Sequence, residues 1–298
     1  MLKVLIIGSN GQLGRSFKLQ TDNAIALGIE LQFTDRQTLD ITNKDNIADF
    51  FKSNPVDIVV NTAAYTAVDL AEDNRELADD ANHIAAKNLA IECQNNQCKL
   101  IHISTDYVFD GEQATAYVET DTTRPLGVYG ETKLAGENAV LQHCPQAIVL
   151  RTSWVFSEFG NNFLKTMCRL GQTHRALNIV SDQYGKPTYA PHIANVALKI
   201  IALLEHQDVA GVYHFSGDDE VTWADFARYI FETSNKLDPN FNTPAITDIT
   251  TDQYPTAAKR PKNSSLDCTK IYQLLGIEKY QWQQGVKLSI EALAKDSK

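Results

Sequence analysis

The sequence predicts an α/β protein, with a doubly wound parallel sheet covered by helices and a smaller C-terminal lobe. Two observations point to this fold class. In the first half of the chain, short apolar runs alternate with amphipathic helical patterns, as in repeated βα units. A glycine-rich turn follows the first apolar run and precedes the first helical pattern. Beyond Trp154 the alternation loosens, so the smaller lobe is expected there.

The strands expected in the first half are continuous apolar runs, which is typical of strands buried on both faces of a parallel sheet. Amphipathic patterns between these runs, at residues 84–94 and 131–142, predict covering helices. Together they predict a Rossmann-type NAD(P)-binding domain over residues 1–155. The expected strands are residues 4–7, 31–34, 58–61, 100–104 and 148–151.

The second half, residues 156–298, is expected to form mainly a substrate-binding lobe, interleaved with late strands of the first sheet. Thr222 is an expected N-cap, with Asp225 three residues later. Residues 238–265 are rich in Pro, Asn and Thr and predict a loop. Helices are expected at residues 161–170, up to about 206, 222–234, 269–275 and 282–294, and strands at 178–181 and 211–216.

The composition excludes several classes of protein. With 43% hydrophobic and 21% charged residues among 298, the chain has the composition of an ordinary globular protein. Its apolar stretches are too short to span a bilayer, and a net charge of −10 argues against nucleic acid as a partner. Five scattered cysteines without a C-x-x-C pair indicate reduced thiols, and we expect a cytoplasmic protein.

The glycine-rich turn is the expected site of a dinucleotide. Its G-x-x-G-x-x-G spacing lies between a predicted strand and a predicted helix, where backbone N–H groups can approach a pyrophosphate. A plain structural turn is the alternative for three glycines, and the strand–turn–helix context favours the cofactor. The turn residues expected to bind it are Gly8, Gly11, Gln12, Leu13 and Gly14.

Acidic and basic residues at the end of the second expected strand are candidates for binding the adenosine end of the cofactor. Asp35 would accept hydrogen bonds from the ribose of NADH, whereas Arg36 could pair with the 2′-phosphate of NADPH. We therefore expect use of NADH or NADPH, without a preference. Asp40 and Ile41 are expected to flank the adenine. Further on, the small residues Ala63 and Ala64, followed by Tyr65 and Thr66, are expected beside the cofactor, although the two alanines also suit tight packing.

Tyr129 and Lys133 are the expected catalytic pair. They lie four residues apart at the start of a predicted helix, so both side chains can face one cleft. A nearby ammonium should lower the phenol pKa and make Tyr129 a usable proton donor or acceptor. Thr105, at the end of a strand in the same sheet, is expected to polarise a carbonyl oxygen there. Ser104 precedes it, and strand alternation suggests that only one of the two faces the site, for which we choose Thr105.

At these residues the sequence resembles the extended short-chain dehydrogenases and, more narrowly, the dTDP-4-dehydrorhamnose reductases. The resemblance spans the chain. It rests on Gly11-Gln12-Leu13-Gly14, Ala67-Val68-Asp69, Ser104-Thr105-Asp106-Tyr107-Val108-Phe109, Tyr129-Gly130-Glu131-Thr132-Lys133-Leu134-Ala135-Gly136-Glu137, Arg151-Thr152-Ser153-Trp154-Val155, Gly160-Asn161-Asn162-Phe163 and Arg260-Pro261-Lys262-Asn263-Ser264.

The resemblance implies reduction of the C4 ketone of dTDP-4-dehydro-6-deoxy-L-mannose to dTDP-L-rhamnose. It implies that Tyr129 protonates the carbonyl oxygen, that Lys133 holds the nicotinamide ribose, and that Thr105 and Asp106 contact the substrate. Trp154 resembles a residue that contacts the sugar, although a core aromatic would look the same.

Arg260 and Lys262 are the residues expected to bind the diphosphate of the dTDP-sugar, since arginine offers a bidentate fork. A solvated basic loop is the alternative for this pair.

One departure from the family concerns magnesium. Some members are described as binding it through acidic side chains at a dimer contact. Here Ser16, Pro191 and Ala292 stand where those carboxylates are needed. We therefore expect no protein-bound metal and no metal-bridged dimer, but a monomer or a weak homodimer.

Three other functions remain open at this point. A reductase that yields the C4 epimer, dTDP-6-deoxy-L-talose, would need almost the same residues. A non-catalytic NADP-binding regulatory subunit would have no need of the tyrosine and lysine. A nucleotide-sugar epimerase or dehydratase would recycle its bound NAD without net consumption.

Overall fold

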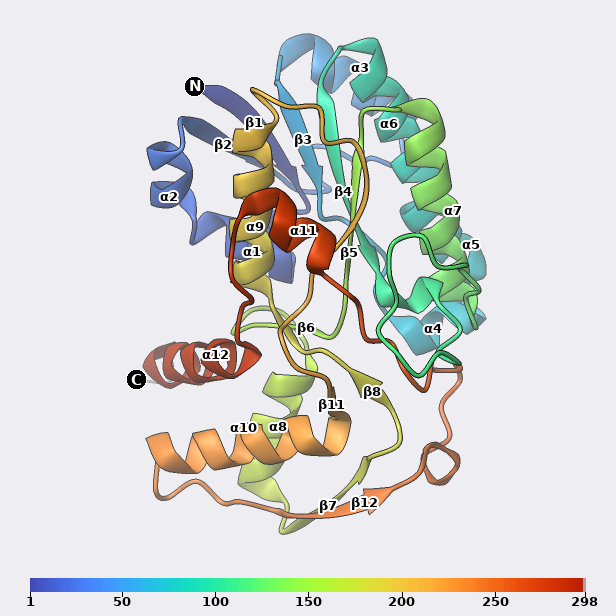
Figure 1. Ribbon diagram of the computed structural model, residues 1–298. Helices are drawn as coiled ribbons and strands as arrows, with labels where there is room; N and C mark the ends of the chain where they lie inside the picture. Colours follow the sequence, from blue (N-terminus) through green and yellow to red (C-terminus); the bar gives the residue numbers. More distant parts are fainter. Residues whose placement is uncertain (297–298) are drawn as a thin grey trace.

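A six-stranded parallel sheet forms the centre of the structure, a computed structural model that describes residues 1–296 (Figure 1). The strand order is β10-β5-β4-β3-β1-β2. The chain builds outward from β1 in both directions, which confirms the doubly wound α/β prediction. The strands are β1 (Leu2–Ile7), β2 (Ile29–Thr34), β3 (Ile58–Asn61), β4 (Lys99–Thr105), β5 (Ile148–Thr152) and β10 (Gly211–His214).

Successive strand residues enter two separate cores, because side chains alternate across a sheet. On β1, Val4 and Ile6 belong to one core, whereas Leu5 and Ile7 belong to the other. Helices cover both faces of the sheet (Figure 1). One face carries α1 (Gln12–Lys18), α2 (Thr21–Ala26), α9 (Ala190–Leu203) and α11 (Thr269–Leu275), and the other carries α3 (Lys44–Ser53), α6 (Ala85–Asn95) and α7 (Val128–His143).

Short helical segments pack against the beginning of α7. Ala71 and Ala78 form a small apolar cluster with Val128, and Tyr65 and Tyr129 pack against it. This cluster holds the start of α7 at the carboxyl edge of the sheet. The segments are α4 (Val68–Asp73), α5 (Arg75–Asp79) and η1 (Asp80–Ile84), and η2 (Asp106–Val108) follows β4.

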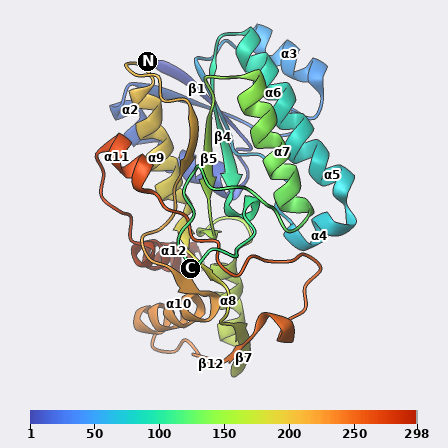
Figure 2. The same cartoon turned by 45° about the vertical axis from the view of Figure 1, so that its right-hand side comes forward.

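The smaller lobe lies beyond the carboxyl ends of the strands (Figures 1 and 2). Its core contains Phe156, Phe226 and Trp282. Thr222 caps α10 in a capping box with Asp225, as predicted. The lobe contains α8 (Phe163–Thr173), α10 (Trp223–Leu237), α12 (Trp282–Asp296), η3 (Thr251–Gln253) and the strand pairs β7 (Ala176–Val180) with β12 (Ala245–Ile249), β6 (Val155–Phe156) with β9 (Thr188–Tyr189), and β8 (Tyr184–Gly185) with β11 (Val221–Thr222).

The prediction of a loop over residues 238–265 was partly wrong, because β12 lies within this range. This strand pairs only with β7, and most of its residues are exposed, so it carries no apolar run that a sequence could reveal. The second half also supplies the edge strand β10 to the first sheet. Within residues 1–296, no helix has the length and apolar character needed to cross a membrane.

Candidate active site

A cavity of about 840 Å³ lies at the carboxyl edge of the sheet, between the sheet and the smaller lobe. Ligands of doubly wound folds bind at this edge, next to the point where the strand order reverses. Residues from the first half and from the lobe both line the cavity. From the first half they are Gly8, Gly11, Gln12, Leu13, Thr62, Ala63, Ala64, Thr66, Val68, Ile103, Ser104, Thr105, Asp106, Tyr107, Tyr129, Lys133, Thr152 and Trp154.

The glycine turn forms one end of this cavity with its backbone. Gly8 has φ +83°, and a Cβ there would lie 2.9 Å from the Ala63 nitrogen. Gly14 is behind the cavity wall, where a Cβ would lie 2.3 Å from the Gly8 oxygen. The first glycine therefore permits the turn, and the last one lets α1 pack closely against it. The turn is tied to the second strand, since the Gly8 nitrogen donates to the Thr34 oxygen at 3.1 Å.

Of the four residues expected near the adenosine, Asp35 accepts a hydrogen bond from Asn10 of this turn, and none of the four lines the cavity that residues 1–296 form. Hydrogen bonds from Thr38, Asn10 and Gln37 hold the Asp35 carboxylate and lower its pKa. Asp40 accepts from Thr42 and forms a 3.7 Å ion pair with Arg36.

The ion pair of Arg36 with Asp40 lies at the surface. The Arg36 side chain is 81% exposed, and exposed pairs contribute little stability. Ile41, in contrast, is buried. Arg36 thus lies beside the Asp40 carboxylate with most of its side chain exposed.

Ala63, Ala64 and Thr66 line the cavity after β3. Tyr65 lies between them, and its backbone is held at both ends by one side chain, because Asn82 accepts from the Tyr65 nitrogen at 2.8 Å and donates to its oxygen at 3.1 Å. This role of Asn82 was not predicted from the sequence. Asn82 lies outside the helix expected at residues 84–94, so the sequence carried no signal for this role.

Thr105, Tyr129 and Lys133 all line the same cavity. Tyr129 and Lys133 project from the first turns of α7, while Thr105 ends β4. The structure thus brings together the three residues that the sequence singled out.

The pKa values of Lys133 and Tyr129 differ from the expectation that the ammonium lowers the phenol pKa. Lys133 is 2% exposed, and its ammonium donates to the Ile103 oxygen at 2.7 Å. Burial lowers the Lys133 pKa to about 8, with Glu137 opposing the shift. Burial raises the Tyr129 pKa to about 12, against a hydrogen bond from Thr105. The expected lowering of the phenol pKa is therefore absent here, because burial and the nearby Asp106 raise the Tyr129 pKa by more than the Thr105 hydrogen bond lowers it. The protonated phenol that results is the form that a ketone reduction uses.

Three buried oxygens in residues that line this cavity have no hydrogen-bond partner among residues 1–296. They are Ser104 Oγ, Thr152 Oγ1 and the Oδ2 of Asp106. The other Asp106 oxygen accepts from the Thr105 hydroxyl at 3.0 Å, and burial raises the Asp106 pKa to about 6. Ser104 lines the cavity together with Thr105, and the choice of Thr105 as the residue that acts on the substrate stays a prediction.

Trp154 is both a cavity wall and a packing residue. It has φ 45°, an uncommon value for a bulky residue. Its ring stacks on Trp223 at a centroid distance of 3.5 Å and donates to Ser264 Oγ at 3.2 Å. A Cβ at Gly185 would lie 2.3 Å from this ring. The strained backbone and the close packing fix the indole at the boundary between the sheet and the lobe.

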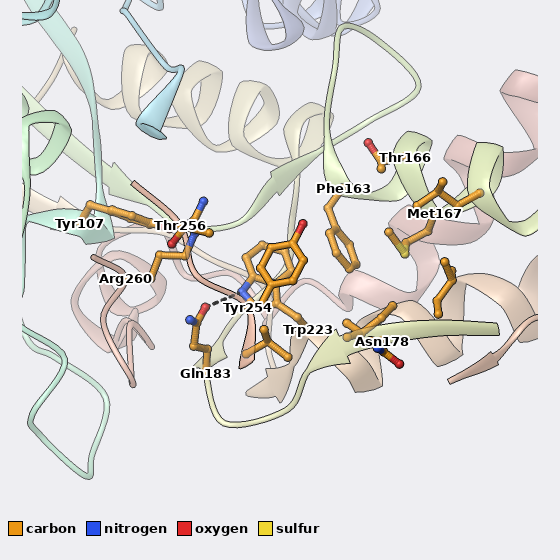
Figure 3. A pocket seen from close by; sticks show the side chains of 14 residues that line it. Tyr107, Phe163, Thr166, Met167, Asn178, Gln183, Trp223, Tyr254, Thr256 and Arg260 are labelled. Atoms are coloured by element: carbon orange, nitrogen blue, oxygen red, sulfur yellow. Dashed lines mark hydrogen bonds between the residues drawn. The ribbon is translucent and has the colours of Figure 1, made fainter. Parts of the chain in front are cut away.

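A second cavity of about 460 Å³ adjoins the first and shares Tyr107, Phe163 and Trp223 with it (Figure 3). Figure 3 shows Arg260 at one end and Met167 at the other. Its wall is largely apolar, which suits a flat or hydrophobic group rather than a bare anion. The sequence argument missed its aromatic residues, because they come from segments far apart in the chain.

Arg260 lines the second cavity, and Lys262 does not belong to the wall that the described residues form around either cavity. Arg260 makes a bidentate ion pair with Asp69, with N–O distances of 2.7 and 3.2 Å. This pair raises the Arg260 pKa although burial opposes it. Lys262 is exposed.

No cluster of three or more His, Cys, Asp or Glu side chains suited to a metal ion exists among residues 1–296. Ser16, one of the positions compared with metal-binding relatives, is buried, and its hydroxyl donates to the Gln12 oxygen at 2.9 Å.

Comparisons with known proteins agree over nearly the whole chain. The RmlD substrate binding domain family matches residues 2–295. The dTDP-4-dehydrorhamnose reductase of Aggregatibacter actinomycetemcomitans is 44% identical, covering 96% of this chain and 98% of that protein. The reductase of the same name from Escherichia coli K12 is 39% identical, covering 98% of each.

Solved structures give the same picture. The dTDP-4-dehydrorhamnose reductase of Clostridium acetobutylicum superimposes with a TM-score of 0.90 at 38% identity, covering 98% of this chain and 100% of that one. The Bacillus anthracis reductase in complex with NADP gives a TM-score of 0.87 at 33% identity, covering 98% and 99%.

Proposed function

The chain belongs to the RmlD substrate binding domain family, and from this membership and the site we propose that it reduces the C4 ketone of dTDP-4-dehydro-6-deoxy-L-mannose to dTDP-L-rhamnose. The protein is an NAD(P)H-dependent oxidoreductase of dTDP-rhamnose synthesis. One observation carries the proposal: Thr105, Tyr129 and Lys133 border a single cavity that joins the glycine turn to the second cavity.

The cofactor half of the reaction fits the glycine-turn end of the cavity. Reduced nicotinamide, when bound, supplies a hydride to C4. Gly8, Gly11, Gln12 and Leu13 would hold the diphosphate through backbone groups, with Gly14 keeping the turn tight. Asp35, Arg36, Asp40 and Ile41 would meet the adenosine, and the segment from Ala63 to Thr66 would pass beside the cofactor.

The proton half of the reaction falls to the side chains of β4 and α7. Tyr129 donates its phenol proton to the ketone oxygen as that oxygen gains negative charge. Thr105 donates a hydrogen bond to the same oxygen and keeps it in line with Tyr129. Lys133, charged below pH 8, stabilises the phenolate left behind and holds the nicotinamide ribose.

The substrate half of the site is assigned to the lobe side. The Asp106 carboxylate, which lies near Ser264, would accept a hydrogen bond from a sugar hydroxyl, and Trp154, stacked on Trp223, would form an aromatic part of the wall beside the sugar. The thymidine diphosphate group would enter the second cavity with Arg260 at its charged end. Lys262 would assist only from the surface.

The decisive experiment supplies the 4-keto sugar nucleotide with NADH or NADPH, follows the loss of absorbance, and determines the product by NMR. We expect net consumption of either cofactor and dTDP-L-rhamnose as the product. A C4-epimeric product would identify a 6-deoxy-L-talose-forming reductase. Turnover without net cofactor consumption would identify an epimerase or dehydratase, and binding without turnover a regulatory subunit.

We also propose that the protein needs no bound metal, works in the cytoplasm and is a monomer or a weak homodimer. Its five cysteines are unpaired, which suits a reducing compartment. Activity lost on chelation and restored by magnesium would contradict the first point. Sedimentation at micromolar concentration tests the oligomeric state.

A further inference from the structure

The side chain of Gln12 does not point at the cofactor cavity alone. It also forms hydrogen bonds with the chain segment of residues 155–162, which connects the sheet to α8. Its Nε2 donates to the Val155 oxygen at 3.2 Å, and its Oε1 accepts from Ser157 Oγ at 3.0 Å and from Asn162 Nδ2 at 2.6 Å. Both polar atoms of this carboxamide are thus engaged with one segment, some 145 residues away in sequence.

The 155–162 segment is in turn locked to itself and to α8. Asn162 donates to the oxygens of Ser157 and Phe159 at 2.8 and 3.1 Å. Its Oδ1 accepts from the Lys165 nitrogen at 3.0 Å, so the same asparagine is the N-cap of α8. On the other side, Arg15 of α1 lies over the Phe159 ring at 4.2 Å.

These contacts connect the two cavities. Gln12 lies in the glycine turn and lines the first cavity together with Gly160 and Asn162. The next turns of α8 present Thr166 and Met167 to the second cavity (Figure 3). One partly buried side chain, that of Gln12, therefore connects the turn to the segment that leads into the wall of the second cavity.

We propose that Gln12 is a positioning residue that couples the cofactor turn to the nucleotide-binding wall of the lobe, so that a dinucleotide bound in the turn strengthens binding of the nucleoside diphosphate part of the substrate. This inference rests on the proposed function. Ordering the turn orders the 155–162 segment, and α8 with it. Coupling of this kind is reciprocal, so each ligand strengthens the other by the same factor.

Ser157 allows the coupling to be tested without touching either cavity. It is fully buried, belongs to neither cavity wall, and donates to Gln12 through its hydroxyl. Ser157→Ala therefore weakens the connection from the lobe side. Gln12→Met, which keeps the length of the side chain, removes it from the turn side. Ser16→Ala is the matched control, because it removes an equally buried hydroxyl that bonds only to the Gln12 backbone.

The measurement is the dissociation constant of thymidine diphosphate, by calorimetry, with and without saturating NADPH. For wild type and Ser16→Ala we expect at least about fivefold tighter binding with NADPH, the lower end of usual couplings. For Ser157→Ala and Gln12→Met the ratio should fall towards one, while Ser157→Ala keeps its affinity for NADPH alone within about twofold. A ratio in Ser157→Ala equal to that of wild type overturns the proposal, as does a wild-type ratio of one.

Hydrogen exchange of the α8 amides provides a second readout that requires no nucleotide-sugar binding and applies even if a variant loses stability. NADPH should slow exchange over residues 163–173 in wild type, and by less in the variants that fold. Unchanged exchange in wild type overturns the coupling. If both ligands bind cooperatively but the sugar nucleotide is not reduced, the proposed reaction fails and the coupling stands. If the sugar nucleotide is reduced and the variants show the same binding ratio as wild type, the proposed reaction stands and the coupling fails.

Discussion

The cofactor end and the substrate end of the active site differ in the size of the side chains that form them. The cofactor end is largely backbone and small residues, with Gly8, Gly11 and the alanines after β3. The substrate end is built from large side chains such as Trp154, Trp223 and Arg260, which come from three separate segments. A backbone site is damaged by added atoms, whereas a side-chain site is damaged by removed ones. This difference makes the two ends separable by mutation.

The largest effect is expected where the two ends meet. Tyr129→Phe removes the proton donor but keeps the ring in the apolar cluster with Val128, so kcat should fall by about 10²–10⁴-fold. Affinity for NADPH should change by less than about twofold. Steady-state and binding measurements check both.

Tyr117→Phe is the matched control, because that phenol donates to Asp110, away from both cavities. It should leave kcat unchanged. A Tyr129→Phe enzyme with near wild-type kcat would remove the proposed proton donor.

At the backbone end, Gly14→Ala adds a methyl group that would lie 2.3 Å from the Gly8 oxygen. Overpacking of this kind costs about 1–3 kcal/mol, so we expect a lower free energy of unfolding and weaker NADPH binding. Gly11→Ala, whose methyl would lie 3.3 Å from the same oxygen, should be milder. Urea unfolding and NADPH titration measure the pair, and equal effects would contradict the close-packing role of Gly14.

At the side-chain end, Arg260→Met should raise the KM for the sugar nucleotide by roughly tenfold or more, because a charge-assisted hydrogen bond to the diphosphate is lost. The KM for NADPH should stay the same. Lys262→Met, two residues away and exposed, should change neither constant appreciably. A larger effect from Lys262 than from Arg260 would reverse our assignment.

The pH dependence depends on Lys133, whose pKa burial lowers to about 8. Below that pH the ammonium is present, and above it the charge is lost, so kcat/KM should fall by about tenfold per pH unit on the alkaline side. Tyr129, with a pKa near 12, stays protonated over this range. Lys133→Arg should remove the alkaline limb from the remaining activity. An alkaline decrease in kcat/KM that persists in this variant would show that another group titrates there.

The smallest effect is expected at the rim of the cofactor end. Arg36→Met removes an exposed guanidinium, and such contacts contribute about 0–1 kcal/mol, so the KM for NADPH should rise by no more than about fivefold. The KM for NADH should not change. Kinetics with both cofactors test this, and an equal rise for both would show that Arg36 does not contact the 2′-phosphate.

The sequence alone predicted the doubly wound fold class, the positions of the six strands of the main sheet, the glycine turn and three residues that the structure brings to one cavity. These signals are local: a buried parallel strand is a continuous apolar run, and Tyr129 and Lys133 are one helical turn apart. Their positions follow from the rule that parallel strands bring their carboxyl ends to one edge.

Only the tertiary structure decided the direction of the Tyr129 pKa shift, the second cavity, the pairing of Arg260 with Asp69 and the hydrogen bonds of Gln12 to residues 155–162. Each depends on burial or on contacts between distant segments, and β12 escaped prediction for the same reason, since it is defined by its pairing with β7 rather than by its own pattern. Desolvation and long-range contacts are properties of the packed chain, and no short stretch of sequence contains them.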